Sequence, residues 1–280
     1  MKTKDYMSKN QEIIKKWQKE YETRGGDSTK FCWDGIMFRG KLRKADNSNY
    51  WIHDESEDHR ENQLWSEVKP RILFLTKDQN LGNEEAWDVR QESYLHPNSK
   101  PEEYWLRKDC PLFKMIVYSL YGLANTTPEK TICWNDIKDA DALQFEENYP
   151  FARINCKKEG GTNCCPNPLL HKAIEEYSNY LEEQINNLHA DIFVCFGSSE
   201  GGYEVDKQNL SLDFLNHHGY NFKYIGKDNI YYDEVKNKVA IDSYHPNYRG
   251  IKDKEKYNEI VQTYYQFLQA HPDFLKLIKR

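Results

Sequence analysis

The sequence predicts an α/β protein: a three-layer αβα sandwich around a central, mostly parallel, four-stranded sheet. Two observations predict this fold class. Short apolar runs that do not alternate with polar residues, such as 72–75, are typical of strands covered on both faces. An amphipathic stretch, 167–188, leads directly into the apolar run 191–197. A helix followed by a buried strand is the crossover unit of a parallel sheet.

The first 69 residues are expected to form a helical and irregular extension packed on a core domain that spans residues 70–280. Apolar residues at helical spacing predict a helix over 9–22, and Gly25-Gly26 marks its end. Residues 31–69 set aromatic side chains among charges without a regular period, which indicates an irregular lead-in.

The core domain begins with Pro70-Arg71, which introduces the strand 72–75. A polar loop, 78–100, and a helix over 101–121 with Pro101 in its first turn follow. Further strands are expected at 151–155 and 191–197, on either side of the helix 167–188. The runs 230–232 and 239–241 flank a polar turn, and apolar spacing predicts a last helix over 254–270.

Composition narrows the class of protein. The 280 residues carry a net charge of −6, with 20 Tyr and 7 Trp supplying much of the apolar material. No apolar run approaches the ~20 residues of a membrane span, and Met1 to Asp5 lack the apolar stretch of a secretory signal. We therefore expect a cytoplasmic protein without membrane contact, and a monomer.

The seven cysteines are an odd number and widely scattered, which favours reduced thiols. The densest group, Cys156, Cys164 and Cys165, contains no Cys-x-x-Cys pair, so buried or loop thiols are favoured over a metal or iron–sulfur site. We expect neither a metal nor another cofactor.

Three polar side chains follow predicted strands: Asp78, Asn155 and His245. Open α/β sheets bind ligands at the carboxyl ends of their strands, so the three are expected to converge. Their chemistry suits cleavage of a base from a sugar. A carboxylate stabilises the oxocarbenium-like sugar and accepts a proton from water, an imidazole stabilises the leaving anionic base, and an amide offers a donor and an acceptor to a pyrimidine edge.

The order of these motifs resembles the uracil-DNA glycosylase superfamily. The motifs are Leu75-Thr76-Lys77-Asp78-Gln79-Asn80, then Arg153-Ile154-Asn155, then Phe193-Val194-Cys195-Phe196-Gly197, then His245-Pro246-Asn247. The resemblance implies that Asp78 orients the attacking water, Asn155 reads the pyrimidine edge and His245 contacts the base carbonyl. The chain departs from the family at Thr76, Gln79 and Asn80, where Gly, Pro and Tyr are usual. By this resemblance, Asn80 in place of the larger Tyr allows a base substituted at its 5-position.

Further candidates serve the binding of an extruded base and of DNA. Trp87 or Tyr94 in the first loop is a stacking partner for the base, and Asn80 lines the base site. Lys157 and Lys158 are expected to contact phosphate, as are Arg249 and Lys252, while Tyr248 or Arg249 enters the base stack. A chain of net charge −6 must gather these cations on one face to bind DNA.

The sequence therefore predicts a monofunctional DNA glycosylase that hydrolyses the N-glycosidic bond of uracil or a modified pyrimidine in single- or double-stranded DNA. Base-excision repair and defence against phage with modified DNA are the two expected settings. Two alternatives stay open: a non-catalytic nucleobase- or nucleotide-binding module of the same fold, and a hydrolase of free nucleosides or nucleotides. Each of the three residues also has a purely structural interpretation. Asp78 and His245 are of types common in turns, and the Asn155 side chain can form hydrogen bonds with the backbone of a loop.

Overall fold

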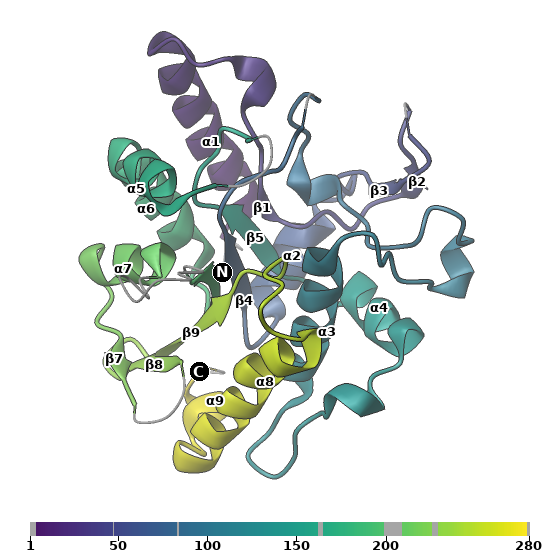
Figure 1. The fold of residues 1–280 in the computed structure, drawn as a ribbon, viewed down its shortest axis with the longest axis vertical. Coiled ribbons are helices and arrows are strands. Elements are labelled where there is room, and N and C mark those ends of the chain that lie inside the picture. The colour runs from purple at the N-terminus through teal and green to yellow at the C-terminus, as the bar shows by residue number, and fades with distance from the viewer. Residues whose placement is uncertain are drawn as a thin grey trace.

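A seven-stranded sheet forms the centre of the molecule (Figure 1). The computed structural model describes residues 4–46, 48–82, 84–161, 165–198, 209–225 and 229–278. The strand order is β1-β5-β4-β6-β9-β8-β7. The four central strands are parallel: β5 (Ala152–Asn155), β4 (Ile72–Thr76), β6 (Ile192–Ser198) and β9 (Lys238–Tyr244).

Three antiparallel strands complete the sheet at its two edges: β1 (Gly35–Ile36), β8 (Ile230–Asp233) and β7 (Lys223–Tyr224). The predicted mostly parallel α/β class is confirmed, but the predicted four strands are corrected to seven. β1 and β7 are only two residues long and so leave no recognisable pattern in the sequence.

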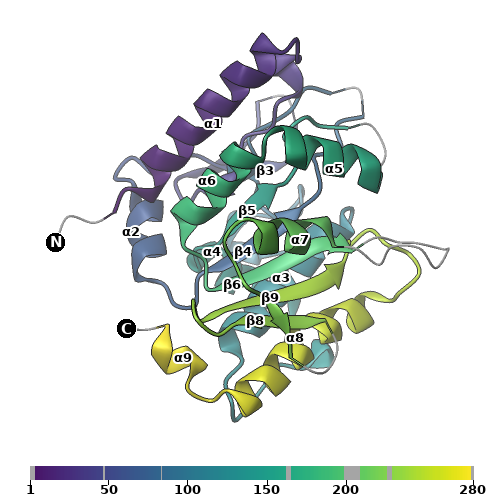
Figure 2. The same ribbon diagram turned by 90° about the vertical axis from the view of Figure 1, so that its left-hand side faces the viewer.

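Helices cover both faces of the sheet (Figure 2). Successive residues of a strand point to opposite faces, so Phe74 and Val194 join one apolar core while Leu75 and Cys195 join the other. The first core is closed by α3 (Pro111–Asn125), α4 (Asp139–Asn148), α8 (Asp253–Ala270) and α9 (Phe274–Leu277). The second is closed by α1 (Tyr6–Thr23), α5 (Asn167–Glu176), α6 (Ser178–Leu188) and α7 (Leu210–His217).

The N-terminal segment contributes directly to the central sheet. β1 pairs with β5, and the stretch read as irregular also holds a hairpin, β2 (Leu42–Lys44) with β3 (Trp51–His53), and the helix α2 (Arg60–Glu67). Short 3₁₀ turns lie at Ser28–Lys30, Val89–Gln91, Pro101–Glu103 and Trp134–Asp136.

Two predicted helices differ from the structure by more than one helical turn. The helix expected over 101–121 is a 3₁₀ turn at Pro101–Glu103 followed by a loop, and α3 begins only at Pro111. The helix expected over 167–188 is broken at Tyr177, whose ψ of 26° departs from helical geometry, into α5 and α6. In the described ranges, no helix has both the length and the apolar character needed to cross a membrane.

Candidate active site

Asp78 and His245, the two predicted catalytic residues, each follow a parallel strand. They therefore lie at the edge of the sheet that is formed by the carboxyl ends of these strands. β6 lies between β4 and β9, and Cys195 is in register with both Leu75 and Asp242. Asp78 lies three residues beyond Leu75. His245 lies three residues beyond Asp242. Since neighbouring strands are about 4.8 Å apart, β4 and β9 are separated by roughly 10 Å across β6.

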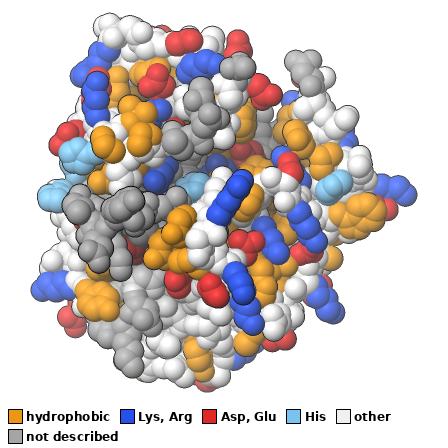
Figure 3. Space-filling view, in the orientation of Figure 1, with side chains coloured by type: hydrophobic (Ala, Val, Ile, Leu, Met, Phe, Trp, Pro, Cys, Tyr) orange, Lys and Arg blue, Asp and Glu red, His pale blue; other side chains and the backbone are white. Residues whose placement is uncertain are grey.

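The carboxyl ends of the central strands lie on one side of the molecule. The arrowheads of β6 and β9 point to the same side of the molecule in Figure 2. Figure 3 views the molecule from that side, and Lys and Arg side chains lie around a hollow near the centre of the view. The arrangement agrees with the general location of ligand sites in open α/β sheets.

Asp78 is a largely buried carboxylate with a cation beside it. Its side chain is 11% exposed, and Lys157 Nζ lies 3.6 Å from its Oδ2 atom. Burial raises the pKa of Asp78, and the positive charge of Lys157 opposes that shift. Gly161 leaves the space that the carboxylate occupies, because a Cβ atom at this position would lie 2.7 Å from Oδ2. The carboxylate is thus held in a site partly shielded from water.

His245 presents a neutral imidazole at the same edge. Its Nδ1 accepts a hydrogen bond of 3.3 Å from the backbone N–H of Asn247, which assigns the ring proton to Nε2. Burial lowers the pKa of His245 to about 4, with smaller contributions from the positive charges of Lys77, Arg153 and Lys256. At neutral pH the ring therefore offers one N–H donor and carries no charge.

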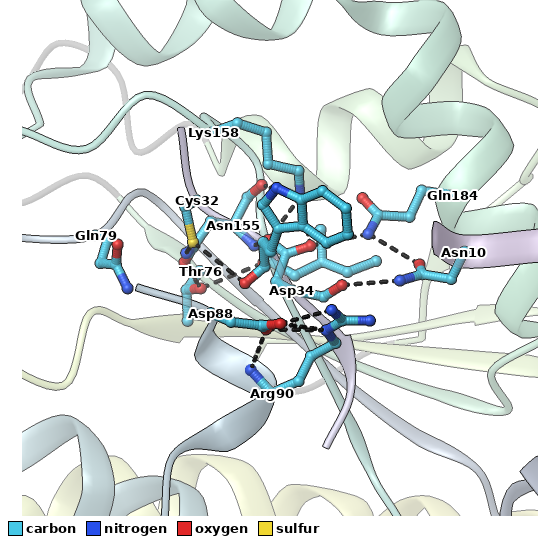
Figure 4. Close-up of polar contacts among 12 residues, drawn as sticks. Asn10, Cys32, Asp34, Thr76, Gln79, Asp88, Arg90, Asn155, Lys158 and Gln184 are labelled. Carbon is cyan, nitrogen blue, oxygen red and sulfur yellow. Dashed lines mark hydrogen bonds and ion pairs between the residues drawn. The ribbon is translucent and has the colours of Figure 1, made fainter. Parts of the chain in front are cut away.

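Asn155 lies in a buried polar network (Figure 4). Its Nδ2 donates to Cys32 Sγ at 3.1 Å, and its Oδ1 accepts from the Thr76 hydroxyl at 2.5 Å. Its backbone N–H donates to Asp34 Oδ2 at 2.8 Å, and the residue has no exposed area. Both ends of the amide are therefore paired within the protein. Asn155 would have to rotate to read a base.

Lys158 belongs to the same network and is not a surface cation. Its Nζ lies 2.6 Å from both carboxylate oxygens of Asp34, and it also donates to the backbone carbonyl of Asn155 at 3.0 Å. The Lys158 side chain is 1% exposed. The prediction that Lys158 contacts DNA phosphate is therefore wrong, because Asp34 already neutralises its charge in the interior.

Lys157 is buried as well, with its side chain 4% exposed. Its Nζ donates to the backbone carbonyl of Glu159 and faces Asp78. The predicted contact with surface phosphate is corrected accordingly: the ammonium group is turned toward the candidate catalytic carboxylate.

Sequence reasoning missed Asp34, which organises this network. Gln184 of α6 donates to Asp34 Oδ1 at 2.8 Å, and Asn10 of α1 donates to the Asp34 carbonyl at 2.9 Å. The next residue, Gly35, has a φ of 137°, and a Cβ there would lie 2.5 Å from Asn10 Nδ2. The Asp-Gly pair is a signal for a special backbone conformation, but it does not reveal the partners of the carboxylate.

The two predicted stacking residues differ in accessibility. Tyr94 has no exposed area and packs between Phe113 and Phe151 in the core, so its predicted stacking on a base is wrong. Trp87 is 39% exposed, and its indole N–H donates to Glu92 Oε1 at 2.8 Å. The side-chain amide of Gln79, directly after Asp78, donates to the backbone carbonyl of Trp87 and accepts from the backbone N–H of Trp87.

The second oxygen of Glu92 pairs with Arg153 of β5 at 2.5 Å, in a contact that the sequence did not reveal. Trp87 is thereby linked to the sheet edge through two side chains. Asn80 is exposed and bridges to Gly161 through its backbone. Trp87 and Asn80 thus stay available to a ligand.

The loop after β9 carries the remaining predicted DNA contacts. Arg249 and Lys252 are exposed, while Tyr248 is half-buried and stacks on Tyr244 with ring centroids 5.3 Å apart. The structure thus leaves Arg249 and Lys252, but not the two lysines after β5, on the surface.

Cys156 and Cys165 are buried, whereas Cys164 lies outside the described residues. In the described part of the chain, no three His, Cys, Asp or Glu side chains gather as metal ligands would. A separate cavity of about 810 Å³ lies between 96–109 and 139–140, with Tyr50 at its border. Neither Asp78 nor His245 lines it.

No family model, curated protein or solved structure matches the chain.

Proposed function

We propose that the protein is a DNA glycosylase that hydrolyses the N-glycosidic bond of uracil or a modified pyrimidine. The observation that carries the proposal is that a shielded carboxylate, Asp78, and a neutral imidazole donor, His245, each lie three residues beyond in-register positions of the two strands that flank β6. An extruded base between these two groups would have its sugar beside the carboxylate and a carbonyl oxygen beside the imidazole.

The two groups divide the reaction between them. Asp78 stabilises positive charge at C1′ and accepts the proton of the attacking water. His245 donates its Nε2 proton as a hydrogen bond to the base oxygen, where negative charge develops. A neutral ring suits this task, because it can donate from Nε2 while Nδ1 accepts from Asn247.

The surroundings supply the remaining requirements of such an enzyme. Trp87 offers an exposed ring for stacking on the flipped base. Arg249 and Lys252 offer charges for the phosphates next to it. In this proposal Asn155 fixes the carboxyl end of β5 through its contacts with Thr76 and Asp34.

A hydrolase of free nucleosides or nucleotides is the second candidate. One observation favours it: Lys157 and Lys158, two of the cations expected to bind phosphate, are buried in internal ion pairs. A smaller substrate needs fewer phosphate contacts than DNA does.

The test is incubation of the protein with uracil-containing DNA, phage DNAs with hypermodified bases and free nucleosides. Abasic sites are then cleaved chemically, and released bases are separated by chromatography. The Asp78→Asn protein serves as the matched control. Base release from DNA by the wild type alone supports the glycosylase. Release from nucleosides alone supports the second candidate, and no release from any substrate rejects both.

A further inference from the structure

We propose that Lys157 is a positioning residue that keeps Asp78 ionised and holds its inner oxygen in place. The inference deepens the proposed function and rests on it for its catalytic meaning. Its physical content, the ionisation of Asp78, can be measured without any substrate.

The geometry of the pair carries the inference. Lys157 Nζ lies 3.6 Å from Asp78 Oδ2, and neither side chain is more than 11% exposed. Oδ2 is itself buried and makes no hydrogen bond of normal length with the described residues. The nearby ammonium group is therefore the main compensation for burying this charge, because a desolvated carboxylate without a counterion takes up a proton.

The backbone fixes the positions of both partners. The N–H of Lys157 donates to the carbonyl of Lys77 at 2.9 Å, and Gly161 donates to Gln79 at 2.8 Å. The segments that follow β4 and β5 thus remain paired by backbone hydrogen bonds. One bond involves the residue before Asp78 and the other the residue after it. A residue larger than Gly161 would clash with the carboxylate, because its Cβ would lie 2.7 Å from Oδ2. Oδ2 is held between these groups, so Oδ1 is the oxygen left to orient water.

The other groups that face the pair do not replace Lys157. Lys77 lies next to Asp78 in the chain, but its Nζ is directed to Asn167 Oδ1 at 3.4 Å. The Cys165 thiol is a neutral neighbour of Asp78, because burial raises the pKa of this thiol to about 12. Glu159 Oε2 lies 4.0 Å from Lys157 Nζ, on an exposed side chain.

The experiment is an NMR titration of ¹³C-labelled aspartate carboxyl groups in the full chain, with the Asp78 signal assigned from its loss in Asp78→Asn. We expect Asp78 to be ionised at pH 7 in the wild type. In Lys157→Met its titration should move about 1–3 pH units upward, as expected for loss of a neighbouring opposite charge. Lys157→Arg should titrate close to the wild type. Lys172→Met, which removes an exposed charge from α5, is the matched control and should change nothing.

Two outcomes would overturn the inference: an Asp78 that is already protonated at pH 7 in the wild type, or a folded Lys157→Met protein with an unchanged Asp78 titration. The first measurement does not depend on Lys157→Met, so it can overturn the inference even where that variant does not fold. In an active enzyme, the acid limb of the pH profile for base release should move upward with the titration. Absence of base release would reject the proposed function and leave the titration to judge Lys157.

Discussion

Lys158 and Asp34 form an ion pair of 2.6 Å although 124 residues separate them in the chain. Neither side chain is more than 1% exposed. Asp34 also accepts a hydrogen bond from the backbone N–H of Asn155. The pair therefore ties the carboxyl end of β5 to the residue before β1, and it stabilises the edge of the sheet that carries the candidate site.

Replacement of Asp34 by Ala should strongly destabilise the protein. The change leaves the ammonium group of Lys158 buried without its partner, which typically costs about 3–5 kcal/mol in the free energy of unfolding. Urea unfolding at neutral pH measures the loss, and Asp46→Ala, at an exposed position, is the control. A loss below about 1 kcal/mol would show that Lys158 finds water or another partner.

His245 should make stability depend on pH in a defined window. Its pKa is about 4 in the folded protein, and about 6.5 is expected in the unfolded chain. Between these values the unfolded chain binds a proton that the folded protein does not. The contribution of His245 is thus complete above about pH 6.5 and is lost as the pH falls toward 4. On acidification, the wild type should lose more free energy of unfolding than His245→Asn, whereas parallel losses would contradict the assignment.

Gly161→Ala should lower the rate of base release by more than any loss in the free energy of unfolding would explain. The added Cβ would lie 2.7 Å from Asp78 Oδ2, so the carboxylate has to move. A displaced general base loses part of the rate enhancement of about 10²–10⁴-fold that such groups contribute. Gly82→Ala is a comparison at an open position, although its φ of 57° adds backbone strain. Equal rates for Gly161→Ala and the wild type would argue against the observed position of Asp78.

The surface cations after β9 should set the salt dependence of DNA binding. Arg249→Ala and Lys252→Ala are each expected to lower the slope of log Kd against log salt by about 1, the effect of one phosphate contact. Titrations of labelled DNA at several salt concentrations give the slope, with Lys19→Ala on α1 as the control. Unchanged slopes in both variants would place the DNA elsewhere.

The sequence predicted the centre of the fold better than its periphery. Runs such as 72–75 and 191–197 are buried on both faces, so their composition alone marks them as strands. The sequence did not predict α4, because the buried face of this helix includes the charged Glu146. Glu146 is paired with Arg39 at 2.9 Å. Pro101 and Pro111 carry the same helix-start signal, and tertiary packing decides that only the second begins a long helix.

The candidate site was predicted in part for a similar reason. Asp78 and His245 could be assigned to the same end of the sheet because both follow parallel strands. The burial of Lys157 and Lys158 could not be foreseen. It depends on Asp78 and Asp34, which the fold brings close from distant parts of the chain.

Single-turnover base release by Asp78→Asn decides between a catalytic and a structural carboxylate most directly. The substrate is whichever DNA the wild type cleaves, circular dichroism verifies the fold, and Asp273→Asn at an exposed position is the control. Loss of the general base predicts a rate about 10²–10⁴-fold below that of the wild type, with DNA binding retained. A folded Asp78→Asn protein that releases the base at the wild-type rate would contradict the proposed mechanism.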